Sequence, residues 1–174
     1  MGEKKMRIET ERLVITEFTM DMAQAVHENS LDEDTRKFVP DEVFETLEEA
    51  QETVEFLMSQ YGGSEGPLVY PVLTKEDKNN IGYVQMVPLP DGAWEIGYHI
   101  AKKYTGNGYA TEAVKAFLAE MAETLGISEV YGICLIENIA SVHVLKKTGF
   151  TVLFEGTGDY QGESREIFKS VWRK

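Results

Sequence analysis

The ten residues YTGNGYATEA, 104–113, decide how the rest of the sequence is interpreted. Gly106 and Gly108 stand two apart, and a run of helix-forming residues follows directly. Glycine permits positive φ values and close backbone approach, so the N–H groups from Gly106 to Tyr109 can point into one concavity. The helix that follows adds the positive end of its dipole. The stretch therefore predicts a loop that binds a phosphate or pyrophosphate, although a plain glycine-bearing turn before a helix has the same pattern.

Two common nucleotide-binding motifs do not fit this loop. A P-loop requires a lysine directly after its second glycine, and the residues after Gly106 supply no such lysine. A dinucleotide-binding fingerprint requires a third glycine and a loop that directly follows a strand. Thr111 holds the third position here, and residues 101–105 separate the expected strand from the loop. Neither a P-loop nor a Rossmann fingerprint is therefore expected.

The sequence on both sides of the loop predicts regular elements. Before it, residues 93–100 alternate and follow two strand-like segments separated by turn residues, which predicts an antiparallel meander. After it, apolar residues recur at helical spacing up to Gly126, which predicts a long helix facing the core. Further strands are expected at 12–18, 67–74, 80–89, 129–136, 150–156 and 165–172, and further helices at 19–30, 46–61 and 138–149.

The order of these elements predicts a mixed α/β domain of the α+β type. We expect a central, mostly antiparallel sheet of about six to seven strands, with two helices before the meander and two in the C-terminal half. Thr19, Thr46 and Asn138 are the expected N-caps of three of these helices. With 174 residues and no repeat or linker-like stretch, the chain is expected to form a single domain, 1–174.

Charge and cysteine content limit the classes of partner. The net charge is −13, and the first 65 residues carry 17 acidic against 6 basic side chains. Such a surface repels nucleic acid and anionic membranes and suits a cationic ligand, although a solvated acidic face explains the same composition. Cys134, the single cysteine, lies in an apolar run and is expected to be a core thiol. No signal-peptide pattern or membrane-spanning apolar stretch is present, so a cytoplasmic location is expected.

Two longer stretches resemble the coenzyme-binding elements of one family. Residues 95–118, EIGYHIAKKYTGNGYATEAVKAFL, are similar to the acetyl-coenzyme A signature of the GNAT superfamily of N-acyltransferases, Q/R-x-x-G-x-G/A, with Lys103 at the Q/R position. Residues 138–150, NIASVHVLKKTGF, resemble the later element N-x-x-S-x-x-x-x-x-K-x-G-F of the same family. IETERLVITEF, 8–18, resembles the branch of ribosomal-protein alanine N-acetyltransferases (RimJ/RimL type), although Thr16 replaces an arginine of its E-R-L-x-L-R pattern.

The resemblance implies that acetyl-CoA is the acetyl donor. Its pyrophosphate would lie on the amides of the glycine loop, and its pantetheine arm would run beside the strand at 93–100, where that strand splays from the next. A backbone N–H near Ile100 would polarise the thioester carbonyl. Lys147 is expected near the phosphates, although a lysine late in a helix also suits the helix dipole. The implied cofactor-binding residues are Ile100, Lys103, Gly106, Asn107, Gly108, Tyr109, Ala110, Asn138, Ser141 and Lys147.

Glu95 is the first candidate for the general base that deprotonates the acceptor amine. Strand alternation places Glu95, Gly97 and His99 on one face, and Gly97 permits a bulge that would re-aim its neighbours. Many members of the resembling family carry a carboxylate at the position of Glu95, where it removes the amine proton, often through water. His99 is the alternative base, because an unperturbed imidazole titrates near pH 6.5. The plainer interpretations are a solvent-facing glutamate and a histidine bonded by the backbone.

The departing thiolate of the coenzyme needs a proton. Many members of the family carry a tyrosine seven residues after the asparagine, and this position is Leu145 here. A proton from Ser141, a proton from water and unassisted departure remain as alternatives, and Ser141 is preferred as the second catalytic residue. His27 and His143 have no carboxylate or cysteine companion at ligand spacing, so no metal site is expected.

The combined expectation is an acetyl-CoA-dependent N-acetyltransferase that works by direct attack in a ternary complex. A protein or peptide N-terminal α-amine is the favoured acceptor, since its pKa near 8 asks less of a base than a lysine amine with a pKa near 10.4. The alternatives are acetylation of a small amine, such as a polyamine or an aminoglycoside, and a non-catalytic coenzyme A-binding module. The sequence does not name the acceptor and leaves monomer and homodimer equally open.

Overall fold

The computed structural model describes residues 5–174. The first four residues of the expected domain, 1–174, lie outside the described residues. The chain folds around an eight-stranded sheet with the order β1-β2-β3-β4-β5-β6-β8-β7. Neighbouring strands are antiparallel except β5 and β6, which are parallel. The mostly antiparallel α+β fold predicted from the sequence is therefore confirmed. The strands are β1 (Arg7–Glu9), β2 (Leu13–Thr16), β3 (Leu68–Thr74), β4 (Asn80–Pro88), β5 (Trp94–Ile100), β6 (Glu129–Leu135), β7 (Thr151–Tyr160) and β8 (Glu163–Arg173).

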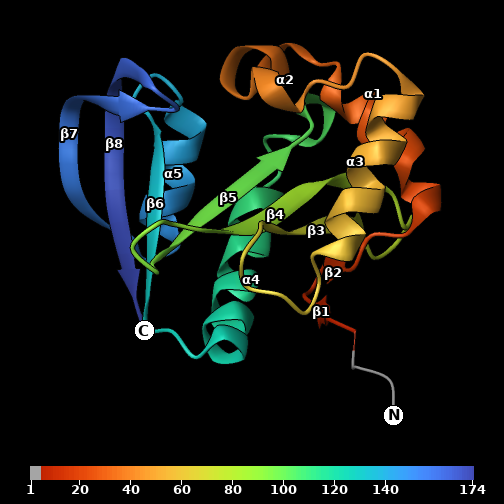
Figure 1. Cartoon of the computed structure of the whole chain (residues 1–174), viewed down its shortest axis with the longest axis horizontal. Helices are drawn as coiled ribbons and strands as arrows, with labels where there is room; N and C mark the ends of the chain where they lie inside the picture. Colours follow the sequence, from red (N-terminus) through yellow and green to blue (C-terminus); the bar gives the residue numbers. More distant parts are fainter. Residues whose placement is uncertain (1–4) are drawn as a thin grey trace.

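Five α-helices and three short 3-10 turns connect the strands within residues 5–174. Figure 1 shows α4 on one face of the sheet, α1 and α3 on the opposite face, and α5 beside β6. The helices are α1 (Ala23–Ser30), α2 (Glu33–Phe38), α3 (Leu47–Ser59), α4 (Tyr109–Leu125) and α5 (Ile139–Lys147), and the 3-10 turns are η1 (Met20–Met22), η2 (Pro40–Glu42) and η3 (Lys102–Tyr104).

Strand alternation divides the apolar core between the two faces of the sheet. Leu68, Tyr70 and Val72 of β3 are buried on the face covered by α4, whereas Val69 packs in a smaller cluster on the face covered by α1 and α3. The predicted core stripe of α4 is confirmed by its buried residues Ala113, Val114, Phe117, Leu118, Met121 and Ala122. On β5 the apolar residues face α4, so the opposite face carries the polar side chains.

Local capping explains where the main helices begin and end. Thr46 accepts a hydrogen bond from the Glu49 amide at 3.2 Å, while the Glu49 carboxylate accepts from the Glu45 amide at 3.0 Å. Gly126 ends α4 with φ 65°, in the left-handed region that favours glycine. Asn138 caps α5 through a hydrogen bond from the Ser141 amide. These predicted boundaries are confirmed.

Two elements are missing from the sequence prediction. The short helix α2 follows Asp32, whose carboxylate accepts a hydrogen bond from the Thr35 amide at 2.8 Å. Its six residues are too polar to show an apolar period, so three helices rather than two precede the meander. The three-residue β1 is too short to alternate, and it brings the sheet to eight strands rather than six to seven. The first predicted helix begins at Ala23 rather than directly after Thr19, because η1 intervenes.

The parallel strands β5 and β6 separate soon after they pair. Their register contains only two pairs, Glu95 with Tyr131 and Ile96 with Gly132. The rest of β5, up to Ile100, pairs with β4 but not with β6. In Figure 1 the two strands start side by side and diverge toward the top of the view. The predicted splay is therefore confirmed. None of the helices in the described part of the chain has the length and apolar character needed to cross a membrane.

Candidate active site

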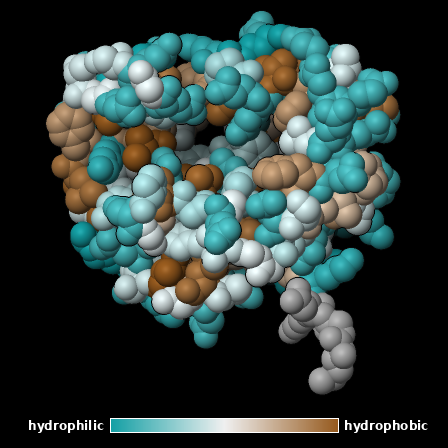
Figure 2. Space-filling model, viewed as in Figure 1, coloured by the Kyte–Doolittle hydropathy of each residue, from teal (hydrophilic) through white to brown (hydrophobic). Residues whose placement is uncertain are grey.

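The divergence of β5 and β6 opens a cleft of about 400 Å³. Its walls come from the splayed strands, the first turn of α5, the segment from α2 to η2, and the turn between β7 and β8. Figure 2 shows this face of the molecule hollowed between the part built from β6, α5, β7 and β8 and the part built from α1 and α3. The lining includes Glu95, Gly97, His99, Asn138, Ser141 and Tyr160.

Glu95 is one of the two residues of β5 that pair with β6, and it lines the cleft. The side chain is half-buried, and no described residue donates a hydrogen bond to its carboxylate. Burial raises the pKa of Glu95 to about 6, and the charge of Lys169 opposes this rise. Such a carboxylate is ionised at neutral pH yet basic enough to accept a proton from an amine. Its position and its pKa suit the predicted base.

Gly97 makes room for a neighbouring side chain and does not form a bulge. The register between β4 and β5 is unbroken, with Gly97 opposite Gln85. A Cβ at position 97 would overlap with the Gln85 side chain. The predicted bulge is therefore wrong, and the glycine instead lets Gln85 lie across β5 on the face that carries Glu95 and His99.

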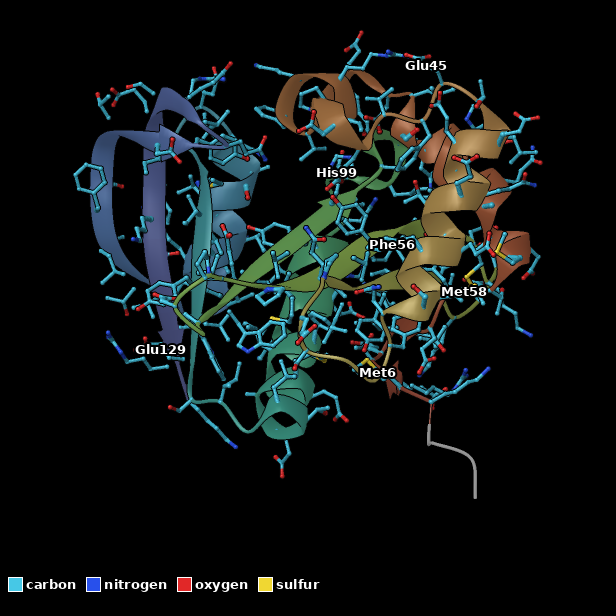
Figure 3. The ribbon with its side chains drawn as sticks, viewed as in Figure 1. Met6, Glu45, Phe56, Met58, His99 and Glu129 are labelled. Atoms are coloured by element: carbon cyan, nitrogen blue, oxygen red, sulfur yellow. The ribbon has the colours of Figure 1, made fainter. Side chains whose placement is uncertain are left out.

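His99 is bonded to α2 rather than to the backbone. Its Nε2 lies 2.8 Å from Thr35 Oγ1, and that hydroxyl donates to Asp32 Oδ1 at 2.8 Å. Since the hydroxyl has one proton, the imidazole donates through Nε2–H and keeps its lone pair on Nδ1. Burial lowers the pKa of His99, with Asp32 and Asp34 opposing, so the ring is neutral at pH 7. Figure 3 shows His99 on β5, beneath α2.

Asp32 also reaches the segment that leads to the glycine loop. Its second oxygen accepts a hydrogen bond from the backbone N–H of Lys102 at 2.8 Å, at the start of η3. Burial alone would raise the pKa of Asp32, but the hydrogen bonds from Lys102 and Thr35 lower it overall. A single carboxylate therefore joins α2 to the connection between β5 and α4.

Ser141 is paired with a tyrosine that the sequence did not single out. The Tyr98 hydroxyl lies 2.7 Å from Ser141 Oγ and 3.0 Å from the Ser141 carbonyl oxygen. Burial raises the pKa of Tyr98 above its ordinary range, so the phenol stays protonated. Both residues line the cleft, as does Leu145, which holds the position where related sequences carry tyrosine. Two hydroxyls therefore stand together where a proton donor is expected.

The glycine loop has the backbone geometry that the sequence predicts. Gly106 and Gly108 have φ values of 83° and 80°, in the left-handed region, and Gly108 is the N-cap of α4. Asn107 folds its side chain back, and its Nδ2 donates to a loop carbonyl at 3.1 Å. The N–H groups of Tyr109 and Ala110 belong to the first turn of α4, where a helix supplies no acceptors. The loop is therefore shaped to present N–H groups to an anion.

The start of α4 is fixed by the N-terminal strand region. Glu112 accepts hydrogen bonds from Thr10 Oγ1 at 2.5 Å, from the Arg12 amide at 3.0 Å and from Arg12 Nε at 2.8 Å. The E-R-L stretch thus anchors the helix that follows the loop. Thr16, which replaces the arginine of the resembling branch, donates to the Met6 carbonyl at 3.2 Å.

Three of the remaining predicted cofactor residues, Ile100, Lys103 and Lys147, do not line the cleft. Ile100 is buried at the end of β5, where the backbone edge has no β6 partner. Lys103 is exposed in η3, with its Nζ 5.2 Å from the centre of the Tyr104 ring. Lys147 is exposed in the last turn of α5, at the opposite end of that helix from Asn138.

Sequence reasoning missed the residues that long-range packing brings to the cleft. One feature of the sequence could have identified Tyr98, because a tyrosine on the core face of a strand usually needs a hydrogen-bond partner. No local pattern in the sequence indicates that Tyr83 on β4 donates a hydrogen bond to Glu42 of η2. Cys134 is the buried free thiol that the sequence predicts, and it also lines the cleft. Within residues 5–174, no group of three or more His, Cys, Asp or Glu side chains is placed to hold a metal ion.

Comparison with known proteins agrees with this geometry. Residues 12–151 match the acetyltransferase (GNAT) domain family. The chain belongs to this family. The match covers the glycine loop, the splayed strands and the N-cap at Asn138.

Individual relatives of this GNAT acetyltransferase extend the match. It is 30% identical over 145 residues to YnaD of Bacillus subtilis (strain 168), named as an uncharacterized N-acetyltransferase, with 83% of this chain and 82% of YnaD covered. A GNAT-family acetyltransferase from Bacillus anthracis has a TM-score of 0.82 at 26% identity, covering 97% of this chain and 98% of the other. RimL, a ribosomal L7/L12 alpha-N-protein acetyltransferase solved in complex with coenzyme A, has a TM-score of 0.81 at 18% identity, covering 97% and 98%. The likeness to RimL concerns the fold.

These findings confirm three predictions from the sequence. The protein is a GNAT-family member with a RimL-like fold, it is an N-acetyltransferase, and acetyl-CoA is its acetyl donor.

Proposed function

We propose that this GNAT acetyltransferase moves the acetyl group of acetyl-CoA onto a protein or peptide N-terminal α-amine, by direct attack in a ternary complex. The observation that carries the proposal is Glu95, an unbonded carboxylate on the cleft wall whose pKa is raised by burial to about 6. The RimL-like fold supports the choice of an α-amine. We further propose that residues 1–174 act as one domain, and that the buried free thiol of Cys134 reflects a cytoplasmic location.

Glu95 accepts the proton that the amine loses. An α-ammonium group has a pKa of about 8, so transfer to a carboxylate with a pKa of about 6 costs about 2 to 3 kcal/mol. A lysine ammonium, with a pKa of about 10.4, would cost about 6 kcal/mol. His99 is the less suitable base, because burial lowers its pKa and its Nε2 proton is committed to Thr35.

The backbone holds and polarises the donor. The edge of β5 beyond Ile96 has no β6 partner, so its N–H and C=O groups are free to bond the pantetheine arm as a strand would. A backbone N–H there also stabilises the oxyanion that forms when nitrogen attacks the thioester carbon. The amides from Gly106 to Ala110 take the pyrophosphate, with Lys103 and Lys147 near the phosphates.

Ser141 and Tyr98 supply the proton that the leaving thiolate of the coenzyme takes up. As the carbon–sulfur bond breaks and the carbon–nitrogen bond remains, the thiolate takes a proton from Ser141 Oγ. The Tyr98 hydroxyl, 2.7 Å away, supports the serine by replacing that proton. Glu95 releases the first amine proton to solvent, then accepts the second proton that the nitrogen loses after attack and releases it as well, while solvent returns one proton to Tyr98. Each acetyl transfer therefore releases one proton.

The test measures acetyl transfer to a mixture of peptides with varied N-termini, polyamines and aminoglycosides, read by mass spectrometry. We expect the added acetyl group on a peptide α-amine. Glu95→Gln should lower kcat by about 10²- to 10⁴-fold while acetyl-CoA affinity is kept. Glu155→Gln, an exposed carboxylate on β7, is the matched control and should leave kcat unchanged.

The pH profile gives a second readout. Activity of the unmodified enzyme should rise with pH through about 6 as Glu95 ionises, and Glu95→Gln should lack this limb. Acetylation of only a polyamine or an aminoglycoside would replace the α-amine proposal with small-molecule chemistry. Binding of acetyl-CoA without any product would point to a binding module.

A further inference from the structure

A second cavity adjoins the cleft on the same face of the sheet. It has a volume of about 170 Å³ and lies between α1, α3 and the strands β3 to β5. Its walls include the apolar side chains Phe18, Val26, Phe44, Leu57 and Val69. An apolar cavity of about 150 Å³ is large enough to bind benzene, so this cavity has room for one branched or aromatic side chain.

Three polar side chains around this cavity, those of Asn29, Ser30 and Glu42, are bonded within the protein. Asn29 Nδ2 donates to the Asn80 carbonyl at 2.8 Å, and Ser30 Oγ donates to the His27 carbonyl at 2.8 Å. Glu42 accepts a hydrogen bond from the Tyr83 hydroxyl, and burial raises the pKa of Glu42, so a charge is disfavoured there. The cavity therefore offers apolar surface and no ready partner for a charged guest.

Four residues line both the cavity and the cleft: Glu42, Tyr83, Gln85 and His99. Tyr83 is opposite His99 in the β4–β5 register, and Gln85 is opposite Gly97. Glu95 stands on the same strand face, two and four residues from Gly97 and His99. The apolar cavity is thus continuous with the walls that surround the candidate base.

We propose that this cavity binds an apolar side chain carried next to the acceptor amine, so that the enzyme prefers acceptors whose first residue is leucine, methionine or phenylalanine. The proposal rests on the proposed function, because it places the α-amine near Glu95 and directs the first side chain past Gln85, which lines both the cleft and the cavity. Burial of one such side chain favours it over glycine by about 10- to 100-fold.

The test compares kcat/KM for peptides that differ only in the first residue: leucine, methionine, phenylalanine, glycine, serine and aspartate. We expect the three apolar residues to exceed glycine and serine by at least about tenfold, with aspartate lowest. Val26→Phe fills the cavity and should lower kcat/KM for the leucine and phenylalanine peptides by about tenfold or more, with little change for glycine. Val152→Phe, at a position 42% exposed on β7, is the matched control and should change none of these values.

A second variant covers the case in which Val26→Phe does not fold. Leu57→Ala enlarges the same cavity and should shift the preference from leucine toward phenylalanine. Acetyl-CoA affinity and melting temperature serve as folding controls for both variants. Equal rates for all six peptides, or an equal loss for all six in Val26→Phe, would overturn the proposal.

The experiment also separates this proposal from the proposed function. 2-Phenylethylamine and putrescine are tested alongside the peptides as apolar and polar amines. If no peptide reacts but 2-phenylethylamine does, and Val26→Phe removes that activity, the cavity proposal stands and the α-amine proposal fails. If only putrescine and other polar amines react, or no apolar acceptor of either kind reacts, the cavity proposal is overturned.

Discussion

The proposed coenzyme half and the proposed acceptor half of the site are built in different ways. The coenzyme half comes from one continuous run of chain, from β5 at Trp94 to the end of α5 at Lys147, and its key features are backbone features: two glycines at positive φ, a free strand edge and a helix cap. The acceptor half is assembled from side chains on α1, α2, η2, α3 and three strands. Apart from the two glycines and Asn138, these features tolerate changes of side chain, whereas an assembled wall changes its preference with one substitution.

After the loss predicted for Glu95→Gln, the largest effect is expected where a side chain acts inside the proposed coenzyme half. Ser141→Ala removes the proposed proton donor, and kcat should fall by about 10- to 100-fold with acetyl-CoA affinity unchanged. Tyr98→Phe keeps the ring and removes the hydroxyl that lies 2.7 Å from Ser141, so its loss should be smaller but of the same kind. Steady-state kinetics and calorimetric binding measure both. An unchanged kcat in Ser141→Ala would mean that water or no group protonates the thiolate.

The next effect concerns the stability of the fold, because the burial that raises the pKa of Glu95 also destabilises the folded state when Glu95 is ionised. The pKa of Glu95 is raised from 4.5 to about 6 by burial, which corresponds to about 2 kcal/mol. The folded state binds the proton more tightly, so this destabilisation is absent below about pH 4.5 and complete above about pH 6. Glu95→Gln should therefore stabilise the fold by up to about 2 kcal/mol at pH 8 and by almost nothing at pH 4.

Urea unfolding at the two pH values checks this expectation. Glu155→Gln, the exposed control, should give no gain at either pH. A gain of equal size at pH 4 and pH 8 would show that burial of the charge is not the cause.

A smaller effect distinguishes backbone strain from loss of the anion site. Gly106 and Gly92 have φ values of 83° and 85°, and an added Cβ would meet no atom within 4 Å at either position. Each alanine substitution should therefore cost about 1 to 2 kcal/mol of stability from the left-handed backbone alone. Only Gly106→Ala lies in the coenzyme loop, so it alone should weaken acetyl-CoA binding, by up to about tenfold. Equal affinities in the two variants would remove the loop from the coenzyme site.

The contrast between the two halves also explains what the sequence predicts. Gly106, Gly108 and Asn138 act through neighbouring backbone, so their roles follow from residues close by in the chain, and the structure has the expected φ values and cap. The apolar stripe of α4 follows from the helical periodicity of its residues. The separation of β5 from β6 follows from the resemblance to the GNAT family. Glu95 and Ser141 lie on the cleft as expected, and their catalytic roles stay predictions.

What the sequence could not predict depends on contacts between distant segments. Thr35 bonds His99 from 64 positions away, and it belongs to α2, whose acidic sequence indicates only a solvated face. Tyr98 meets Ser141 only because α5 packs beside β6. Gly97 suggested a bulge, whereas its real constraint is the Gln85 side chain on the neighbouring strand. No local pattern contains such information.

The carboxylate of Asp32 has a consequence for the order in which the two substrates bind. It holds the first turn of α2 through Thr35 and, at the same time, the Lys102 amide at the entrance to the coenzyme loop. We expect acetyl-CoA bound at the loop to stabilise the Lys102 hydrogen bond and, through Asp32 and Thr35, the position of His99 in the acceptor wall. Bound donor should then favour binding of the acceptor. We therefore predict ordered addition, in which desulfo-CoA inhibits competitively against acetyl-CoA and non-competitively against the amine.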